Sequence, residues 1–147
     1  MTKENLEFIP FQKQELEEAF NFYQAALHEV IENVFGWNDS FQRNRFETHY
    51  ELEWFSWIEI ESKRIGYVCY FQKENELHLS LLIIFNEFQS KGYGKIVMNE
   101  IEQYAHKQNK NITLSSFKAN EGAVKFYKSM GYVVTSEDEH FLDLSKF

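Results

Sequence analysis

The stretch "FQSKGYGKIVMNEIEQYA", Phe88–Ala105, places two glycines two positions apart, directly before a helical pattern. The chain has only 6 glycines in 147 residues, and Lys91 and Lys95 flank this pair. The first turn of a helix offers backbone N–H groups without intrahelical partners, and glycines let an anion approach them closely. The stretch therefore predicts a phosphate-binding loop, and an ordinary turn between a strand and a helix is the alternative.

The loop matches neither common nucleotide fingerprint. It lacks the G-x-x-x-x-G-K-[ST] pattern, and its G-x-G spacing lacks the third glycine of a dinucleotide site. Taken alone it predicts an anion site without naming the anion, so a nucleotide-phosphate binder stays open as an alternative.

The segments around the loop predict a mixed sheet with helices. "LHLSLLIIF" is the most apolar strand pattern and is expected to be central. A hairpin of "EWFSWIEIES" and "IGYVCYFQ", turned by "SKR", comes before it. After the loop, a helix buries Val97, Ile101, Tyr104 and Ala105 on one face. A strand "NITLSSF", a short helix "ANEGAVKFYKSMGY" and a final hairpin "YVVTSEDEHFLDL" follow.

Towards the N-terminus, "LEFIPF" predicts a short strand and a helix follows from Gln14 to Val34. A second helix, "FQRNRFETHY", is expected to be capped by Asp39 or Ser40. The order is then β-α-α-β-β-β-α-β-α-β. Helices between the later strands imply crossovers, so we expect an α/β (α+β) fold in one domain, residues 1–147.

Composition narrows the classes of partner and location. The net charge of -8 disfavours a general nucleic-acid binder and slightly favours cationic amines. No apolar run of about 18 residues or secretory signal pattern is present, so we expect no membrane partner. The single cysteine, Cys69, fits a reducing, cytoplasmic setting and is interpreted as a buried filler rather than a nucleophile. The five histidines show no metal spacing, so we expect no metal.

A second motif follows the strand "NITLSSF". Asn120 is placed to cap a helix that opens with Glu121, and Gly131 is placed to end it. Ala123, Phe126, Tyr127 and Met130 share a face of this helix, and at least one of the successive aromatics Phe126 and Tyr127 is expected to leave the core centre. The phenol of Tyr127 suits protonation of a leaving thiolate, and a core aromatic is its alternative interpretation.

With both motifs in this order, the sequence resembles the GCN5-related N-acetyltransferase (GNAT) family. The family's Gln/Arg-x-x-Gly-x-Gly/Ala motif stands here as Gln89-Ser-Lys-Gly92-Tyr-Gly94. Its second motif, Asn-x-x-Ala-x-x-Phe-Tyr followed by Gly-Phe/Tyr, corresponds to Asn120, Ala123, Phe126, Tyr127, Gly131 and Tyr132. The resemblance runs from Leu6 to the end of the chain and implies a mixed, mostly antiparallel sheet flanked by helices.

The resemblance implies acetyl-CoA as co-substrate. Gln89 opens the loop whose backbone amides are expected to hold the pyrophosphate, namely those of Ser90, Lys91, Gly92, Tyr93, Gly94 and Lys95. Backbone groups of Ile83 and Ile84 are expected to pair with the pantetheine arm and polarise the acetyl carbonyl. Asn120 is expected to reach the arm, and Tyr127 to act as general acid towards the sulfur.

Direct attack by a neutral amine calls for a base, because an alkylammonium holds its proton at neutral pH. Several family members carry a Glu or His eleven residues before the Gln/Arg of the loop, and this count gives His78. Ser80, on the same strand face, could hold a water, and Trp37 could line the acceptor pocket. The alternative for His78 is that it faces solvent or packs against a neighbouring strand. The alternative for Trp37 is that it packs in the core.

The resemblance thus implies an N-acetyltransferase that acts through a ternary complex on a primary amine of a small molecule or peptide, with a homodimer as one expected assembly. The alternative is a non-catalytic acyl-CoA-binding or regulatory module on the same fold.

Overall fold

The computed structural model describes residues 5–147 and contains the predicted elements in the predicted order. The strands are β1 (Leu6–Pro10), β2 (Phe55–Ile60), β3 (Lys63–Gln72), β4 (Glu76–Ile84), β5 (Asn111–Phe117), β6 (Val133–Glu137) and β7 (Phe141–Lys146). The helices are α1 (Leu16–Val34), α2 (Asp39–His49), α3 (Tyr93–Lys107) and α4 (Glu121–Ser129). The final β of the predicted order is a hairpin, β6 and β7, as the sequence indicated.

The sheet is mixed and mostly antiparallel, as predicted. Within the described residues it has seven strands in the order β1-β2-β3-β4-β5-β7-β6. β4 pairs in parallel with β5, whereas the pairs β1–β2, β2–β3, β5–β7 and β6–β7 are antiparallel. The apolar strand β4 is the fourth of the seven, which confirms its predicted central position.

Contacts divide the chain into two compact units. The first contains the described residues up to Cys69 together with Leu81–Val97, and the second contains Tyr70–Ser80 together with Met98–Phe147. Strands β3 and β4 and helix α3 contribute residues to both units.

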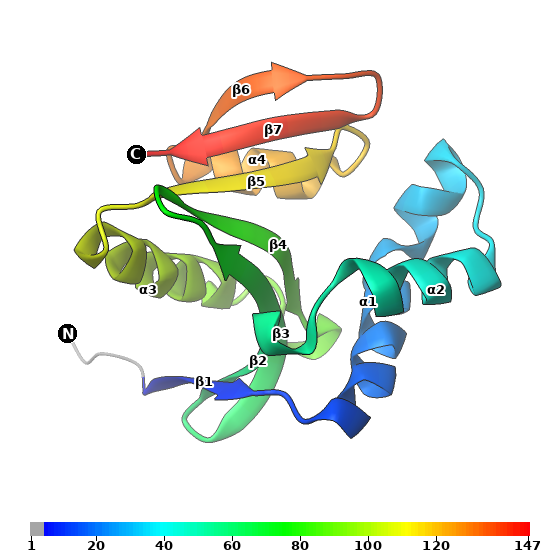
Figure 1. Cartoon of the computed structure of the whole chain (residues 1–147), viewed down its shortest axis with the longest axis horizontal. Coiled ribbons are helices and arrows are strands. Elements are labelled where there is room, and N and C mark those ends of the chain that lie inside the picture. The colour runs from blue at the N-terminus through cyan, green and yellow to red at the C-terminus, as the bar shows by residue number, and fades with distance from the viewer. Residues whose placement is uncertain (1–4) are drawn as a thin grey trace. The chain divides into compact units, whose positions relative to one another are not determined.

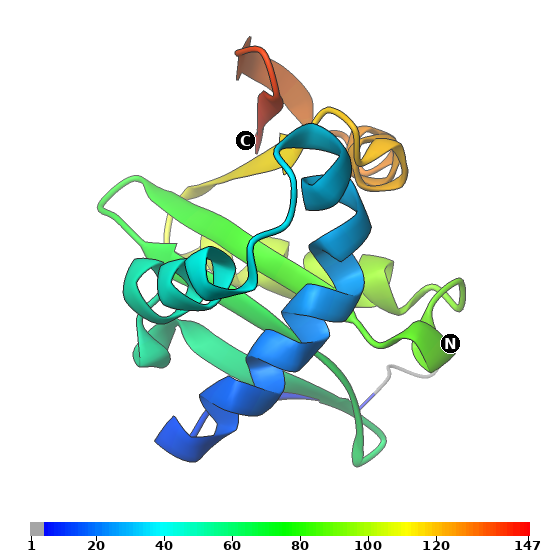
Figure 2. The ribbon, with the colours of Figure 1, turned by 90° about the vertical axis from the view of Figure 1, so that its right-hand side faces the viewer.

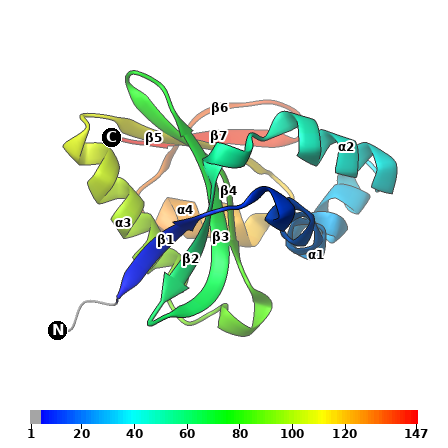
Figure 3. The same ribbon diagram turned by 60° about the horizontal axis from the view of Figure 1, so that its bottom comes forward.

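The first unit has an aromatic core beneath the strands β1, β2 and β3. β1 runs beside β2 from Leu6 opposite Ile60 to Pro10 opposite Ser56, as the ribbon of Figure 3 shows. The ring of Phe11 stacks on Phe55 and Trp57, with ring centroids 5.0 and 4.2 Å apart. All three side chains are buried, so this cluster anchors the unit.

Helix α1 lies across the strands of this unit (Figure 2). Its buried face consists of Ala19, Phe20, Tyr23 and Ile31, the three- and four-residue spacing of an amphipathic helix. The hydroxyl of Tyr67 on β3 donates a hydrogen bond of 2.9 Å to the carbonyl oxygen of Ala19. Phe46 of α2 lies with its ring centroid 5.5 Å from that of Phe20, which joins α2 to α1.

Two boundaries of this unit differ from the prediction. The cap of α2 is Asn38, whose Oδ1 accepts a 2.9 Å hydrogen bond from the backbone N–H of Phe41, rather than Asp39 or Ser40. The turn between β2 and β3 is Glu61–Ser62, with φ of 53° and 65°, so the chain turns before "KR" and those two residues belong to β3.

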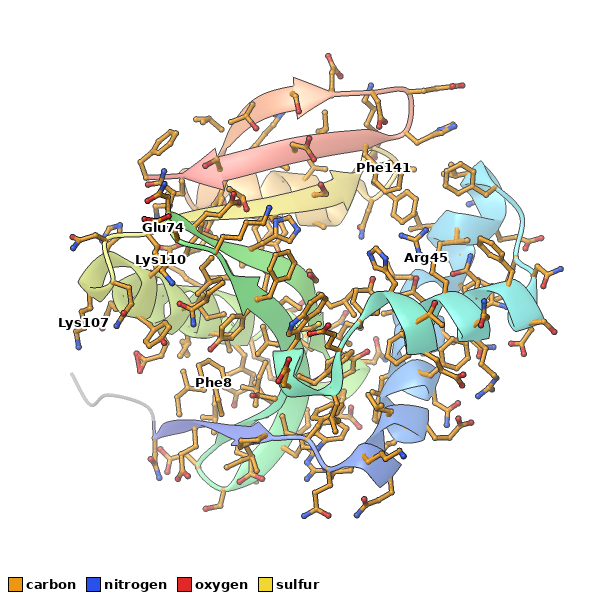
Figure 4. The ribbon with its side chains drawn as sticks, viewed as in Figure 1. Phe8, Arg45, Glu74, Lys107, Lys110 and Phe141 are labelled. Atoms are coloured by element: carbon orange, nitrogen blue, oxygen red, sulfur yellow. The ribbon has the colours of Figure 1, made fainter. Side chains whose placement is uncertain are left out.

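In the second unit, β5, β7 and β6 lie side by side with α4 behind them (Figure 1). The parallel register pairs Glu76–Leu79 with Asn111–Leu114, and β5 pairs with β7 from Ile112 opposite Lys146 to Phe117 opposite Phe141. Figure 4 labels Phe141, whose ring centroid lies 4.5 Å from that of Phe117.

The turn after β3 and the turn after α3 meet at one end of the second unit, where Figure 4 labels Glu74 and Lys110. Lys110 Nζ donates to Gln72 Oε1 at 2.8 Å, and the backbone N–H of Asn111 donates to the carbonyl of Asn75 at 3.1 Å. These bonds fix where β5 begins relative to β4, and hence the parallel register.

The buried face of α3 was predicted with one error. Val97, Ile101 and Ala105 are buried as expected, but Tyr104 is 42% exposed and Met98 is fully buried in its place. The hydroxyl of Tyr104 instead accepts a 3.2 Å hydrogen bond from the side-chain amide of Gln72, so its polar end remains at the surface.

Candidate functional site: a glycine loop, a buried tyrosine and a histidine on β4

The loop that joins β4 to α3 has the backbone of an anion cradle. After a single 3₁₀ turn, Asn86–Phe88, the chain passes through two residues in the left-handed region, Ser90 with φ of 62° and Gly92 with φ of 84°. A Cβ at Gly92 would meet no atom within 4 Å, so its conformation, rather than lack of space, calls for glycine there.

Helix α3 begins directly after this loop. The carbonyl of Gly92 accepts the hydrogen bond of the Ile96 N–H at 3.2 Å, which makes Gly92 the residue before the first turn. The backbone N–H groups of Tyr93, Gly94 and Lys95 therefore belong to the first turn, where helical partners are lacking and the dipole is positive. This arrangement suits an anion, as the sequence predicted.

Gln89 braces the loop against the end of β4. Its side-chain nitrogen donates to the carbonyl of Ile84 at 2.9 Å, and the N–H of Gln89 donates to Asn86 O at 3.2 Å. Ile83 is buried and Ile84 is half-buried. The Gln89 side chain thus has a structural task, which is to fix the loop to the strand that precedes it.

Lys91 and Lys95 carry positive charge beside the loop in a chain of net charge -8. Both side chains are exposed. They supply a local cationic surface next to the first-turn amides of α3, which strengthens the case for a negatively charged ligand.

Asn120 stands before α4, as predicted, but its side chain makes no capping hydrogen bond. Its φ of -85° and ψ of 69° lie outside the extended region that capping residues usually adopt. The carbonyl of Asn120 accepts the first helical bond from Val124 N–H at 3.1 Å. The cap is therefore formed by the backbone only, and the predicted capping role of the side chain is wrong.

Tyr127 is the buried residue of α4. Its ring centroid lies 5.1 Å from that of Phe126 and 5.6 Å from that of Tyr132. Burial raises the pKa of the Tyr127 hydroxyl well above its ordinary value, so the phenol stays protonated at neutral pH. Gly131, with φ of 96°, ends the helix as predicted.

His78 and Ser80 lie on the half-buried face of β4, because burial alternates along this strand. The Nδ1 atom of His78 is 2.8 Å from the hydroxyl of Thr113, its pairing partner on β5. Burial lowers the pKa of His78 below its ordinary value, and this outweighs the raising effect of Glu76. The ring is therefore neutral at neutral pH, the form that can accept a proton.

Trp37 lies between α1 and α2 and is half-buried. Its backbone N–H donates to Glu32 Oε2 at 2.6 Å, and its ring centroid lies 4.6 Å from that of His28. The sequence left open that Trp37 packs in the core, but the residue is not part of the buried core. Cys69, by contrast, is fully buried, and burial raises the pKa of its thiol, so the prediction that it is filler is confirmed.

The predicted site residues are divided between the two units. Ile83, Ile84 and the loop Gln89–Lys95 lie in the first, while His78, Ser80, Asn120 and Tyr127 lie in the second. Sequence reasoning missed Thr113 and Glu76. The second was within reach, since Glu76 precedes His78 by the two-residue period of a strand face.

No cluster of His, Cys, Asp or Glu suited to a metal ion occurs among residues 5–147. In the same part of the chain, no helix combines the length and apolarity that crossing a membrane requires.

Known proteins share this fold. The PaiA N-acetyltransferase of Thermoplasma acidophilum, solved with coenzyme A, is 17% identical with a TM-score of 0.76, over 97% of this chain and 98% of that one. An acetyltransferase of Thermus thermophilus is 13% identical with a TM-score of 0.73, over 99% of both chains. Arabidopsis thaliana Naa50, solved with the bisubstrate analogue CoA-Ac-MVNAL, is 16% identical with a TM-score of 0.62, over 97% of this chain and 98% of that one.

At these identities the likeness shows the fold. The family model for the acetyltransferase (GNAT) family matches residues 14–132, more than half of the chain and including both the glycine loop and the motif of α4. The chain belongs to the GNAT family of acetyltransferases.

Proposed function

We propose that the protein transfers an acetyl group from acetyl-CoA to a primary amine by direct attack within a ternary complex. The observation that carries this proposal is the glycine loop of a GNAT acetyltransferase chain, whose left-handed Ser90 and Gly92 lead into the N-terminus of α3. Its donor set consists of backbone N–H groups and two lysines, which fits the pyrophosphate of a CoA ester.

The binding residues follow from this donor set. The amides of Ser90–Lys95 hold the pyrophosphate, and Lys91 and Lys95 add charge. Gln89 keeps the loop fixed to Ile84. Backbone groups at the end of β4 and the side chain of Asn120, which makes no capping bond, bind the pantetheine arm. When bound, acetyl-CoA supplies an activated acetyl thioester.

Two side chains carry out the proton transfers of the reaction. His78, neutral at neutral pH, takes the proton that the amine loses as its nitrogen bonds to the acetyl carbon, either directly or through a water near Ser80. Tyr127, protonated at neutral pH, gives its proton to the sulfur as the carbon–sulfur bond breaks, and its phenolate then regains a proton from solvent while the His78 imidazolium releases one. The products are an acetylated amine and CoA.

Charge and an aromatic ring favour a cationic acceptor. The net charge of -8 favours a cationic amine, and the half-buried indole of Trp37 offers an aromatic face for one. The Naa50 relative was solved with CoA-Ac-MVNAL, so peptide amines belong in the panel beside small polyamine-like amines.

Turnover against this panel tests the proposal. We expect release of CoA and an equal amount of acetylated product with at least one primary amine. Binding of acetyl-CoA without turnover on any amine favours the non-catalytic module, and absence of binding contradicts the proposal altogether.

Tyr127→Phe separates an enzyme from a binding module. The change removes only the hydroxyl, so kcat should fall by about 10²-fold or more while the affinity for acetyl-CoA stays within a few-fold. Tyr104→Phe, at an exposed tyrosine of α3, is the matched control and should leave both unchanged. An unchanged kcat in Tyr127→Phe removes the tyrosine from the mechanism.

A further inference from the structure

A short chain of polar side chains crosses from β4 to β5 inside the second unit. His78 and Thr113 are partners in the parallel register, and Glu76 lies two residues before His78 on the same strand face. Thr113 Oγ1 lies 2.5 Å from Glu76 Oε2 and 2.8 Å from His78 Nδ1. The three side chains therefore form one connected set, Glu76–Thr113–His78, in a half-buried location.

The direction of these hydrogen bonds follows from the donors available. An ionised carboxylate only accepts, so the single proton of the Thr113 hydroxyl points to Glu76. The lone pair of Thr113 then faces His78, and Nδ1 must carry the hydrogen of that bond. In the neutral ring this leaves Nε2 unprotonated and able to accept.

We propose that Thr113 and Glu76 are positioning residues that hold His78 in the tautomer with Nδ1–H, so that Nε2 is the atom that takes the proton of the attacking amine. This inference rests on the proposed function, in which His78 is the base. His78 is then a base oriented by neighbouring groups, as in a catalytic triad, except that the Thr113 hydroxyl lies between the imidazole and the Glu76 carboxylate.

The surroundings of the ring favour this role. The ring of Phe71 lies beside that of His78, with centroids 5.1 Å apart. The charged groups that act on His78 are Glu76, Lys73 and Asp143. Asp143 accepts hydrogen bonds from Ser115 and Ser136, so its oxygens are already engaged. When Nε2 gains a proton, Nδ1–H keeps its hydrogen bond to Thr113, and the negative charge of Glu76 stabilises the new positive charge on the ring.

Nitrogen-15 NMR of the histidine rings in the full-length protein tests the arrangement without any ligand. In the wild type above the pKa of His78, we expect a protonated Nδ1 and a bare Nε2. Thr113→Val keeps the side-chain volume but removes the acceptor, so the form with Nε2–H should gain population. Thr113→Ser keeps the hydroxyl and should restore the wild-type spectrum. A wild-type ring with Nε2–H, or a spectrum unchanged in Thr113→Val, overturns the proposal.

Kinetics then connect the arrangement to the reaction. Thr113→Val should lower kcat about tenfold or more at pH 7 with the KM for acetyl-CoA unchanged, and Thr113→Ser should recover most of it. Glu76→Gln removes the anion, so the pKa of His78 and the acidic limb of the pH profile should both move down. A kcat insensitive to Thr113→Val, with the NMR result as expected, overturns the positioning role.

The two proposals fail in different ways. If the wild type turns over no amine, the proposed function fails, and the tautomer of His78 still decides whether Thr113 holds the ring. Thermal unfolding of each variant serves as the folding control, and valine is a residue that strands accept readily.

Discussion

At the scale of single residues, Gly66 on β3 shows how closely the strands of the first unit approach. A Cβ built at Gly66 would lie 2.1 Å from the carbonyl oxygen of Ile83 and 3.0 Å from two further backbone atoms of β4. These neighbours are backbone rather than the flexible end of a side chain, so relief would require the strands to separate. Glycine is required here by space, whereas at Gly92 it is required by conformation.

Gly66→Ala should therefore lower the free energy of unfolding by about 3 kcal/mol or more, measured by urea denaturation. Gly122→Ala is the matched control, because its added methyl group meets nothing within 4 Å and lies in the first turn of α4. It should raise stability by about 0.5 kcal/mol through helix propensity. Equal urea midpoints for Gly66→Ala and the wild type would show that β3 and β4 separate at little cost in free energy.

At the scale of elements, the cap of α2 gives a prediction that separates neighbouring residues. Asn38, Asp39 and Ser40 are all good capping types, yet only the Asn38 side chain accepts the bond from Phe41 N–H. Asn38→Ala should cost about 1 kcal/mol of stability in thermal or urea unfolding, and Ser40→Ala, inside the first turn, should cost clearly less. The reverse order of the two effects would contradict this assignment.

The elements also show what the sequence could and could not predict. β5 was predicted with its observed bounds, because polar and apolar residues alternate from Asn111 to Ser115 in a short segment between a helix and a turn. The cap of α2 could not be assigned, since three adjacent residues had the same propensity. Tyr104 and Met98 both fit the apolar stripe of α3, and only packing decides between them.

The same distinction applies to the candidate site. The glycine loop and Tyr127 were predicted from local motifs, because backbone conformation and helix position depend on neighbours in sequence. The link from His78 to Thr113 joins residues 35 positions apart, so it depends on the register of β4 with β5. A single sequence carries no direct signal for that register.

At the scale of the whole molecule, His78 links the site to folding stability. Burial lowers its pKa in the folded state, so below the ordinary histidine value of about 6.5 the unfolded chain binds a proton that the folded chain does not. Stability contributed by the neutral ring is thus present above that pH and declines as the pH falls through it.

Thermal unfolding of the wild type and His78→Asn between pH 8 and pH 5 measures this contribution. The wild type should lose more stability than the variant as the pH falls below about 6.5. The comparison removes the effect of the other histidines, which both proteins share. Parallel curves for the two proteins would mean that folding leaves the pKa of His78 unchanged.

The family match establishes an acetyltransferase of the GNAT type. Because one fold serves many substrates, the identity of the acceptor has to be inferred from the residues of the site. We propose that the loop from Gln89 to Lys95 holds acetyl-CoA through its backbone amides, and this contact can be measured at those atoms.

The most direct test is amide hydrogen exchange by NMR, with and without saturating acetyl-CoA. The amides of Tyr93, Gly94 and Lys95 lie in the first turn of α3, and they should exchange fast in the free protein and slow markedly when the pyrophosphate accepts their hydrogen bonds. The first-turn amides of Asp39 and Ser40 in α2 are the internal reference and should not change. ATP at the same concentration should leave the α3 amides unprotected. Binding of acetyl-CoA with protection elsewhere and none at these three amides would contradict the assignment of this loop as the pyrophosphate site.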